Sequence, residues 1–540
     1  MSAVAASATC ALPAALDAMA ENTTSSLFFR RGGARERVSH AQCRAEAEQL
    51  AEALRGLGVG PGGRVAIHGG TSYEWVLADL ACLATGALSV ALYASAPPGR
   101  AVAAAAESRC RVVLTDRGDA VELFRAAGLE VVFLGPAGAA PVGVTSVGDI
   151  VSAAASFARP APAAQPRHGP FTVVSTSGTL SEPQLFAVHS APLLFTMDRF
   201  AEIYGFDGSD RLLLYLPLSH LPQRMMLYWG LGAGLDFVLS DPAHFAADGA
   251  KLRPSLHVTV PRVLEHLRWR VTTALHRAGT ESAEARAAAY RTAFGGAITS
   301  IFVGSAPTDP ALLAELLAAG LPVNEVYGTT ELGMIGLNTP AGRRPGTVGR
   351  SIPWGEVRLA PETSEIEVRT PTPFLHGRLV DGEVEVQQWD PTAFEPTSDV
   401  GELDADGFLL VRGRLRDFLV LPSGEKVFLR PIEDSLGVAA GAGLCQVTTL
   451  PDGTFAALLF FEGPVPAEAD LVAALRAGNA ALHPWERIRS FATVDRLPSV
   501  EEGCLTETTK PRRHVIDEMH GRGARWQRLG NDSRRKDVPG

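Results

Sequence analysis

The chain has 540 residues, with 49 basic and 59 acidic side chains, a formal net charge of −10 and 46% hydrophobic residues. These values describe a folded protein long enough for more than one domain, and they exclude a disordered chain. The acidic balance argues against a general nucleic-acid binder, which usually carries a basic face. The only lysines are Lys251, Lys426, Lys510 and Lys536, a bias toward arginine that makes each remaining lysine worth explaining.

The cysteines and the apolar segments favour a cytoplasmic protein. The six cysteines show no CxxC pair and no metal-ligand spacing, so we expect reduced thiols. The alanine-rich start has no Lys or Arg before its apolar stretch and already contains Asp17, which does not fit a signal peptide. No apolar run approaches the roughly 18 residues that a membrane-spanning helix needs.

The first part of the chain alternates between helical and strand patterns. Apolar residues at helical spacing predict helices over 36–60 and 73–88, and short apolar runs predict strands over 63–69 and 88–95. The alternation continues through the segments RCRVVLTD and EVVFLGP. Such a succession indicates an α/β fold around a largely parallel sheet.

The rest of the chain changes character twice. The proline- and alanine-rich stretch 153–169 is typical of a linker or surface loop, and further strand–helix units follow it. Beyond residue 346 the pattern becomes short strands with glycine turns. Asp452-Gly453 then predicts a tight hairpin turn, and the polar end from Arg522 onward is expected to be frayed.

A loop rich in serine and threonine follows the predicted strand in FTVVSTSGTLSEPQLFAVHS (171–190). Gly178 would let backbone N–H groups approach a polyphosphate, and hydroxyl donors come from Ser175, Thr176, Ser177 and Thr179. No GK[ST] follows, so this is not a Walker loop. A Ser/Thr-rich surface turn would look similar, and both interpretations remain open.

A second candidate segment is NEVYGTTELGM (324–334). Tyr327 could stack on a base, Thr330 could bond a phosphate oxygen and Glu331 could hold Mg²⁺. The segment alone is equally typical of a capped turn in which Thr-Glu opens a helix.

The third candidate segment runs over 398–434. Asp399 precedes a predicted hairpin and Arg414 stands at its end. An acid can accept both hydroxyls of a ribose, and an arginine can support the sugar or the phosphate. A surface salt bridge is the alternative.

The fourth segment, LPSVEEGCLTETTKPRRHVID (497–517), places Lys510 in a threonine-rich loop ahead of a basic cluster. A lysine in a loop is normally a solvated surface charge.

Together and in this order, the four segments resemble the adenylate-forming superfamily of acyl-CoA synthetases, peptide-synthetase adenylation domains and luciferases. The resemblance covers residues 25–517 and is closest to the long-chain acyl-CoA synthetase branch. Stretches typical of that branch are YLPLSHLPQR (215–224), PSLHVTVPRVLEHL (254–267), GTVGRSIP (346–353) and LTETTKPRR (505–513).

The resemblance implies an α/β protein with two domains. A large N-terminal AMP-binding domain of layered sheets and helices, with a barrel-like section, would cover residues 1–413. A small mobile α+β C-terminal domain would cover 414–540, with Arg416 at the hinge.

The same resemblance implies a role for each matching residue. Ser175 to Thr179 would wrap the ATP phosphates, and Asp399 with Arg414 would hold the ribose. The adenine pocket would be lined by Gly304, Ser305, Ala306 and Pro307, together with Tyr327.

Three further matches concern the chemistry. Thr330 would touch the α-phosphate, and Glu331 would hold the magnesium ion. Lys510 would be the catalytic lysine between the α-phosphate and the attacking oxygen, where a cation removes charge repulsion. Lys426 would approach the site after the C-terminal domain rotates for a second half-reaction.

The chain departs from the family in two motifs. The usual Thr-Gly-x-Pro-Lys-Gly continuation of the phosphate loop reads Leu180-Ser181-Glu182-Pro183-Gln184-Leu185, so Gln184 stands where a lysine is expected. The ribose motif Thr-Gly-Asp is Thr397-Ser398-Asp399, with the acid kept. Such divergence around an intact Lys510 and Glu331 favours a specialised enzyme of bacterial natural-product or antibiotic biosynthesis.

Three functions follow as hypotheses. The first is ATP- and Mg²⁺-dependent activation of a small acid as its AMP anhydride, with release of pyrophosphate and transfer to a thiol or an amine. Coenzyme A is a candidate thiol. The second is a diazotase that activates nitrite to diazotise an aryl amine, and the third is a non-catalytic adenylate-binding relative. His220, Arg224 and Arg262 are candidate pocket residues, with structural hydrogen bonding as their alternative role. We expect neither a nucleic-acid partner nor a membrane span.

Overall fold

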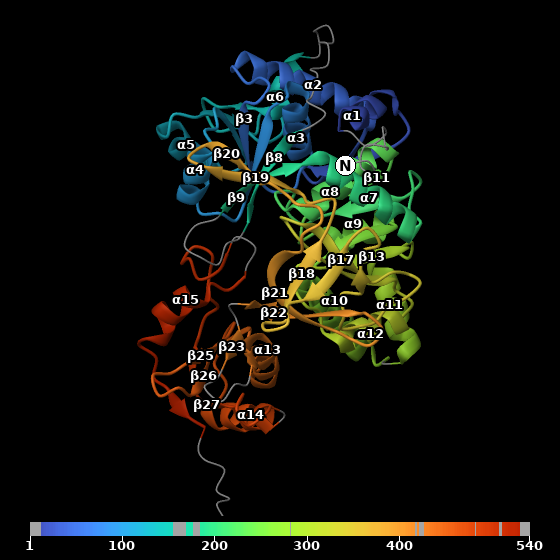
Figure 1. Ribbon diagram of the computed structural model, residues 1–540. Coiled ribbons are helices and arrows are strands. Elements are labelled where there is room, and N and C mark those ends of the chain that lie inside the picture. Colours follow the sequence, from blue (N-terminus) through green and yellow to red (C-terminus); the bar gives the residue numbers. More distant parts are fainter. Residues whose placement is uncertain are drawn as a thin grey trace, which may run out of the picture.

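The computed structural model describes residues 12–154, 169–176, 184–280, 282–415, 418–420, 426–480, 482–506 and 510–529. Figure 1 shows a large N-terminal part and a smaller C-terminal unit beneath it. The N-terminal part is built on two large sheets and one small sheet.

Sheet I, the first large sheet, has nine strands in the order β16-β15-β14-β13-β12-β10-β11-β1-β2. Strands β1 and β10 to β14 are parallel, and antiparallel strands close both edges. The bounds are β1 (Ser26–Arg31), β2 (Ala34–Ser39), β10 (Arg211–Leu214), β11 (Asp236–Leu239), β12 (Leu256–Thr259), β13 (Ser300–Val303), β14 (Val323–Thr329), β15 (Gly333–Leu337) and β16 (Arg350–Ser351).

Sheet II, the second large sheet, also has nine strands, in the order β20-β19-β9-β8-β4-β3-β5-β6-β7. Its strands are parallel from β8 to β7, and β9, β19 and β20 add an antiparallel edge. The bounds are β3 (Arg64–Gly69), β4 (Leu88–Tyr93), β5 (Val112–Thr115), β6 (Glu130–Phe133), β7 (Thr145–Ser146), β8 (Pro170–Thr176), β9 (Gln184–His189), β19 (Leu375–Val380) and β20 (Glu383–Val386).

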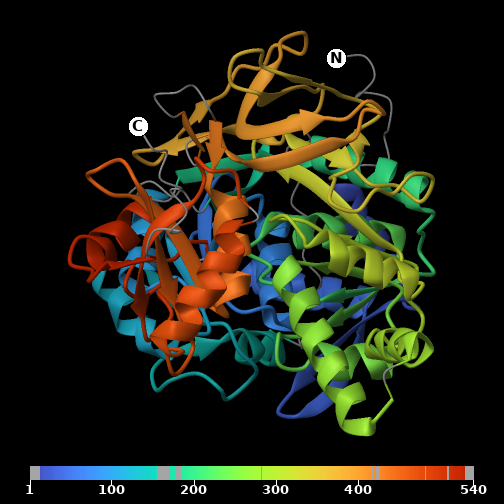
Figure 2. The same ribbon diagram turned by 90° about the horizontal axis from the view of Figure 1, so that it is seen from below.

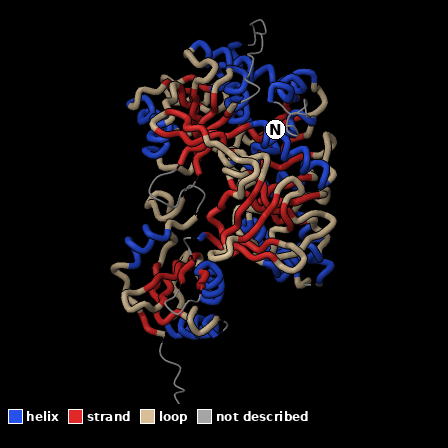
Figure 3. The backbone as a smooth tube through the Cα atoms, viewed as in Figure 1, coloured by secondary structure: helices blue, strands red, loops and turns tan. Residues whose placement is uncertain are grey.

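Helices separate and cover the two sheets, giving the layers seen in Figure 3. The main hydrophobic core joins side chains of both sheets to α1 (Leu12–Glu21), α2 (His40–Gly56), α3 (Tyr73–Thr85), α6 (Val147–Ala154), α7 (Ser190–Tyr204) and α8 (Leu221–Ala233). A second core covers the other face of sheet II with α4 (Pro98–Glu107) and α5 (Val121–Ala126). The outer face of sheet I packs on α9 (Phe245–Leu252), α10 (Pro261–Ala278), α11 (Ala283–Ala293) and α12 (Pro310–Ala318).

The central helix α3 illustrates how the sequence directs this packing. The Ser72 hydroxyl accepts a hydrogen bond from the Trp75 amide at 3.1 Å and so caps the first turn. Gly86, with φ of +77°, ends the helix in a left-handed conformation that favours glycine. Every residue of α3 is buried, as expected for a largely apolar helix that lies between two sheets.

A small antiparallel sheet is found where the resemblance implies a barrel-like section. Its order is β17-β18-β21-β22, with bounds β17 (Glu356–Leu359), β18 (Glu365–Arg369), β21 (Glu395–Leu403) and β22 (Leu409–Arg414). The expected domain boundary at 413/414 falls inside β22, whose last residue, Arg414, pairs with Asp399 of β21. The structure therefore keeps Arg414 with the N-terminal part.

The C-terminal unit is an α+β body with its own hydrophobic core. Its elements are β23 (Phe418–Val420), β24 (Lys426–Phe428), α13 (Leu429–Ala440), β25 (Leu444–Thr449), β26 (Phe455–Phe460), α14 (Glu468–Ala480), β27 (Ile488–Val494), α15 (Arg513–Ile516) and β28 (Gln527–Arg528). Figure 2, seen from below, shows this unit beside the lower face of the N-terminal part. The predicted α/β class with a small α+β C-terminal unit is confirmed.

Three local predictions can be compared with the structure. The hairpin turn at Asp452-Gly453 is confirmed between β25 and β26. The helix predicted over 36–60 is too long at both ends: β2 pairs with β1 up to Ser39, and the helix runs from His40 to Gly56. The frayed end is wrong for the described residues, because β28 pairs with β27 and Leu529 is buried.

The helices of the described residues include none that is both long and apolar enough to cross a membrane. The predicted linker at 153–169 lies almost entirely outside the described residues.

Candidate functional site

Three side chains from three strands meet at the predicted ribose position. The Tyr327 hydroxyl of β14 donates a hydrogen bond of 2.6 Å to one carboxylate oxygen of Asp399 on β21. The Arg414 guanidinium of β22 lies 3.0 Å from the other oxygen. Asp399 is buried, and its backbone amide donates to the Thr397 hydroxyl at 3.1 Å. The strand pairing therefore brings together three residues that are distant in the sequence.

The environment of Tyr327 suits a permanent hydrogen-bond donor. Burial, reinforced by the negative charge of Asp399, holds the pKa of the phenol well above its usual range. The hydroxyl therefore keeps its proton at physiological pH and continues to orient the carboxylate.

Ser398 occupies the position at which the family has glycine. Its φ of +60° lies in the left-handed region, which favours glycine. The substitution departs from the family in residue type and keeps the backbone shape, so that Asp399 still faces Tyr327.

The predicted adenine wall lies beside this cluster, after strand β13. Gly304 continues β13 next to Val326 of β14, and a β-carbon on Gly304 would lie 2.9 Å from the Val326 carbonyl oxygen. Ser305 has a φ of +71° and, like Ala306, is exposed. The close approach of two strand ends leaves these residues on an open edge near Tyr327.

The segment with Thr330 and Glu331 forms the turn of an antiparallel hairpin between β14 and β15. The alternative prediction of a helix opened by Thr-Glu is therefore wrong. The Glu331 carbonyl accepts hydrogen bonds from the amides of Phe374 and Leu375, both at 2.9 Å, which tie the turn to the strand leading into sheet II. Both Thr330 and Glu331 are half-buried.

The carboxylate of Glu331 fits the binding of a magnesium ion that is shared with phosphates. Among the described residues, none forms a hydrogen bond or ion pair with this carboxylate. The same part of the chain contains no group of three or more His, Cys, Asp or Glu that could form an all-protein metal cage. One carboxylate together with phosphate oxygens and water is the usual way in which Mg²⁺ accompanies a nucleotide.

The predicted phosphate loop begins at the end of β8. Ser175 and Thr176 close this strand, opposite Leu185 and Gln184 of β9. Gln184 is exposed at the beginning of β9. Ser177, Gly178 and Thr179 lie outside the described residues, as do the hinge residue Arg416 and the side chain of Lys426.

Lys510 of the C-terminal unit lies near His220 of the N-terminal part. Burial, together with a smaller contribution from the positive charge of Lys510, lowers the pKa of His220 to about 4. His220 Nε2 lies 3.3 Å from the Ser305 hydroxyl. The backbone of Lys510 is fixed by two hydrogen bonds with Thr506, of 2.8 and 3.0 Å. The charge of a lysine in the C-terminal unit therefore acts on a neutral histidine in the N-terminal part.

Arg224 does not line an open pocket, which corrects the expectation for this residue. Its side chain has no exposed surface and lies 2.7 Å from the Asp79 carboxylate. Arg262, the third candidate, is 76% exposed on α10 and lies 3.5 Å from Glu265. His220 is thus the only one of the three that lies beside Lys510.

Glu325 is a buried acid that the sequence analysis did not single out. Burial raises the pKa of its carboxyl group to about 8, partly opposed by hydrogen bonds from the Gly346 amide and from Thr308. The Gly346 amide donates to this carboxyl group at 3.2 Å. The sequence signal that could have identified Glu325 is a charged residue within an apolar strand just before Tyr327.

Comparison with known proteins identifies the same relationship. Residues 16–380 match the family described as AMP-binding enzyme. The long-chain-fatty-acid–CoA ligase FadD15 of Mycobacterium bovis is 27% identical over 552 residues, covering 88% of this chain and 90% of the relative.

Two solved structures share the fold. The anthranilate CoA ligase AuaEII in complex with anthranoyl-AMP has a TM-score of 0.74 at 20% identity, covering 93% of this chain and 96% of that chain. O-succinylbenzoate coenzyme A synthetase (MenE) of Bacillus subtilis, in complex with ATP and a magnesium ion, has a TM-score of 0.73 at 20% identity, covering 93% and 98%. The chain belongs to the AMP-binding enzymes, the adenylate-forming superfamily of AMP-forming ligases.

Proposed function

We propose that this enzyme uses ATP and Mg²⁺ to activate a small carboxylic acid as its acyl-adenylate and then transfers the acyl group to a thiol or an amine. The observation that carries the proposal is the Tyr327–Asp399–Arg414 cluster, with Lys510 of the C-terminal unit close enough to His220 to lower the pKa of that histidine. One side can hold the adenosine, and the other brings a cation to the place where the acid and the α-phosphate would meet.

The chemical step follows from these positions. A carboxylate oxygen of the acid forms a bond to the α-phosphorus, the bond to the bridging oxygen breaks, and pyrophosphate leaves with its electron pair. Lys510 reduces the repulsion between the two anions, and Thr330 donates a hydrogen bond to the α-phosphate. Glu331 would hold Mg²⁺, which supplies positive charge to the phosphates.

Neutral His220 has a distinct part in this arrangement. A histidine with a pKa of about 4 carries no charge at physiological pH, so it does not compete with Lys510 for the carboxylate. Its ring can hold the acid by a hydrogen bond, with the Ser305 hydroxyl 3.3 Å away as a second polar group.

Packing beneath this edge supports a small acid. The ring of Phe302, on β13, is 3% exposed and packs against Phe200, Tyr204 and Phe206 at centroid distances of 4.7 to 6.3 Å. The Tyr204 hydroxyl donates to the Asn338 carbonyl at 2.7 Å, which links α7 to the segment after β15. Aromatic rings therefore fill the core beside β13, and this packing supports a small acid over a long acyl chain.

The acceptor is proposed from the relatives. FadD15, AuaEII and MenE are named as CoA ligases or synthetases, so coenzyme A is the first thiol to test. We also propose a role in natural-product biosynthesis, supported by Gln184 and Ser398 at positions where the family has lysine and glycine.

Exchange of labelled pyrophosphate into ATP tests the proposal directly. The panel contains benzoate, anthranilate, octanoate, palmitate and nitrite, each with Mg²⁺ and without acceptor. We expect exchange with one or more small carboxylates and little with palmitate. Exchange with nitrite alone would instead indicate the diazotase. Exchange with no acid, despite AMP binding, would indicate a non-catalytic adenylate-binding protein.

A further inference from the structure

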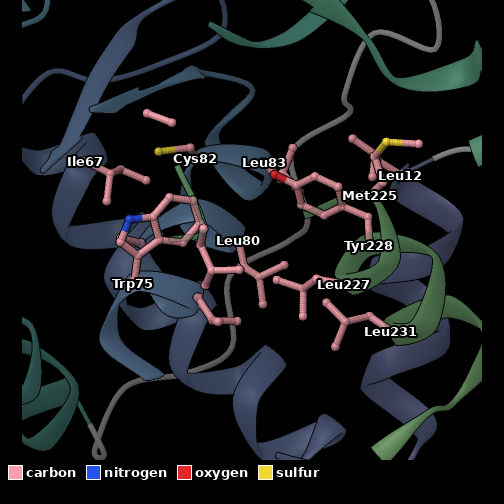
Figure 4. Close-up of a cluster of buried hydrophobic side chains, with 14 of the residues drawn as sticks. Leu12, Ile67, Trp75, Leu80, Cys82, Leu83, Met225, Leu227, Tyr228 and Leu231 are labelled. Atoms are coloured by element: carbon pink, nitrogen blue, oxygen red, sulfur yellow. The ribbon is translucent and has the colours of Figure 1, made fainter. Parts of the chain in front are cut away.

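A buried polar cluster connects sheet II to helices α3 and α8. Its members are Asp79 of α3, Ser89 of β4, Thr172 of β8, and Arg224 and Tyr228 of α8, each no more than 1% exposed. Figure 4 shows Tyr228 on α8 across from Trp75 and Leu80 of α3, within the apolar core that surrounds the cluster. Polar groups so deeply buried need defined partners.

Arg224 is the centre of this cluster. Its Nη2 donates to the Asp79 carboxylate at 2.7 Å and to the Ser89 hydroxyl at 3.0 Å. Its Nη1 donates to the Thr172 hydroxyl at 3.0 Å, and its Nε to the Tyr228 hydroxyl at 2.9 Å. The Tyr228 hydroxyl in turn donates to Asp79. The planar guanidinium thus fixes the direction of each bond.

The cluster joins the two elements that carry the two substrates in the proposed function. Arg224 lies one helical turn after His220, at the beginning of α8. Thr172 lies three residues before Ser175, on the strand that leads into the phosphate loop. The Ser89 hydroxyl also donates a hydrogen bond to the Thr172 hydroxyl at 3.0 Å, which ties β4 to β8.

A second connection holds the segment before α8. The Thr71 hydroxyl, after β3 of sheet II, donates to the Leu216 carbonyl at 2.7 Å and accepts from the Leu218 amide at 3.1 Å. The beginning of α8 is therefore bound to sheet II both before and after His220.

We infer that Arg224 is a positioning residue that sets the distance between the acid at the beginning of α8 and the phosphates beyond β8. A buried ion pair is not required for stability, because well-packed apolar residues can replace one. The distance between two reacting groups, in contrast, strongly affects the reaction rate, because a displacement of about 1 Å can lower the rate about 100-fold. This inference rests on the proposed function, because it assumes that acid and ATP react between these elements.

Thr172→Val tests the inference and keeps the buried Asp79–Arg224 ion pair intact. It removes one hydroxyl and keeps the shape of the side chain. Thr85→Val is the matched control, because Thr85 is also buried, at 1% exposed, and its hydroxyl donates locally, to the Cys82 carbonyl at 2.9 Å. Both full-length variants are compared with the unaltered chain in thermal unfolding, AMP binding and pyrophosphate exchange, using the panel acid with the fastest exchange.

We expect Thr172→Val to lower kcat of exchange by about 10-fold or more, with the Kd for AMP unchanged, since AMP contacts the other end of the site. Thr85→Val should keep the kcat of the unaltered chain. Tyr228→Phe should also lower kcat. The double variant with Thr172→Val and Tyr228→Phe should be no slower than the slower single variant, because both substitutions act through Arg224.

Equal kcat values for Thr172→Val and Thr85→Val would overturn the inference, as would additive effects in the double variant. A loss of thermal stability in Thr172→Val with unchanged kcat would assign the cluster a structural role alone. Absence of exchange in the unaltered chain with every acid contradicts the proposed function instead.

Discussion

The ribose end and the phosphate end of the candidate site are built in different ways. At the ribose end, Tyr327, Asp399 and Arg414 come from strands of the N-terminal part and are already hydrogen-bonded to one another. At the phosphate end, the cation comes from the C-terminal unit as Lys510, and Gln184 is neutral where the family has lysine. In the proposed function, the first end is preorganised for binding, and the second needs residues from both parts of the chain.

This difference has a consequence for catalysis. In the proposed function, the preorganised ribose site would bind the nucleotide without a residue from the C-terminal unit. Charge at the α-phosphate depends on the C-terminal unit, so chemistry and binding can be separated by mutation. The following predictions test that separation, beginning with the largest expected effect.

Lys510→Ala should abolish most adenylation and leave nucleotide binding nearly intact. Loss of a cation that acts on the transition state costs about 10²–10³-fold in kcat. Pyrophosphate exchange measures the chemistry, and calorimetry with AMP measures the binding. Lys251→Ala, another exposed lysine, is the control and should retain full exchange. Unchanged exchange in Lys510→Ala would disprove its catalytic assignment.

Asp399→Asn should show the opposite pattern, with weakened binding as the primary defect. The amide cannot accept from Tyr327, Arg414 and the ribose together, and hydrogen bonds to a charged group contribute about 1.5–3 kcal/mol. The Kd for AMP should rise about 10- to 100-fold. Asp406→Asn is a matched control, because Asp406 lies 2.7 Å from Arg344 on the surface. Equal AMP binding by both variants would contradict the ribose assignment.

Glu325→Gln should change the pH dependence of stability. The folded-state pKa of about 8 lies above the ordinary value of 4.5, so the folded protein binds the extra proton and its stability falls as pH rises from 4.5 through 8. The full effect is on the order of 4 kcal/mol. The melting temperature of Glu325→Gln relative to the unaltered chain should therefore rise between pH 5.5 and 9. A constant difference across this range would refute the raised pKa.

Gln184→Lys should have the smallest effect. Gln184 is exposed at the beginning of β9, so a lysine can reach solvent or phosphate without clashing. We expect the KM for ATP to be equal or up to about 10-fold lower, with stronger salt dependence. Gln184→Met controls for the loss of the amide. A large loss of exchange in Gln184→Lys alone would mean that Gln184 has a specific role at the phosphate end.

The sequence predicts much of the fold because its signals are local. Alternating apolar runs and helical spacing identified α3, β3 and β4, and Asp452-Gly453 identified the hairpin between β25 and β26. The start of α2 was missed because 34–39 pairs with β1 in a hairpin, a contact that helical periodicity does not reveal. The ordered pairing of β28 was missed for a similar reason: its polar sequence gives no sign of the partner strand β27.

Site residues were predictable where they belong to a sequence motif. They were not predictable where tertiary packing determines their contacts. The pairing of Asp399 with Arg414 follows from the hairpin between them, and the structure places them 3.0 Å apart. Arg224 could not be assigned from sequence, because its partners Asp79, Ser89 and Thr172 come from distant segments that meet only in the folded core. Glu325 was missed because burial, not residue type, raises its pKa.

The transfer of an oxygen atom tests the central claim most directly. The activated acid, labelled with ¹⁸O in both carboxylate oxygens, is turned over with ATP and an acceptor, and the products are examined by mass spectrometry. Attack of the acid on the α-phosphorus predicts AMP that carries one ¹⁸O and pyrophosphate that carries none. Unlabelled AMP, or label in phosphate released together with ADP, would contradict the account.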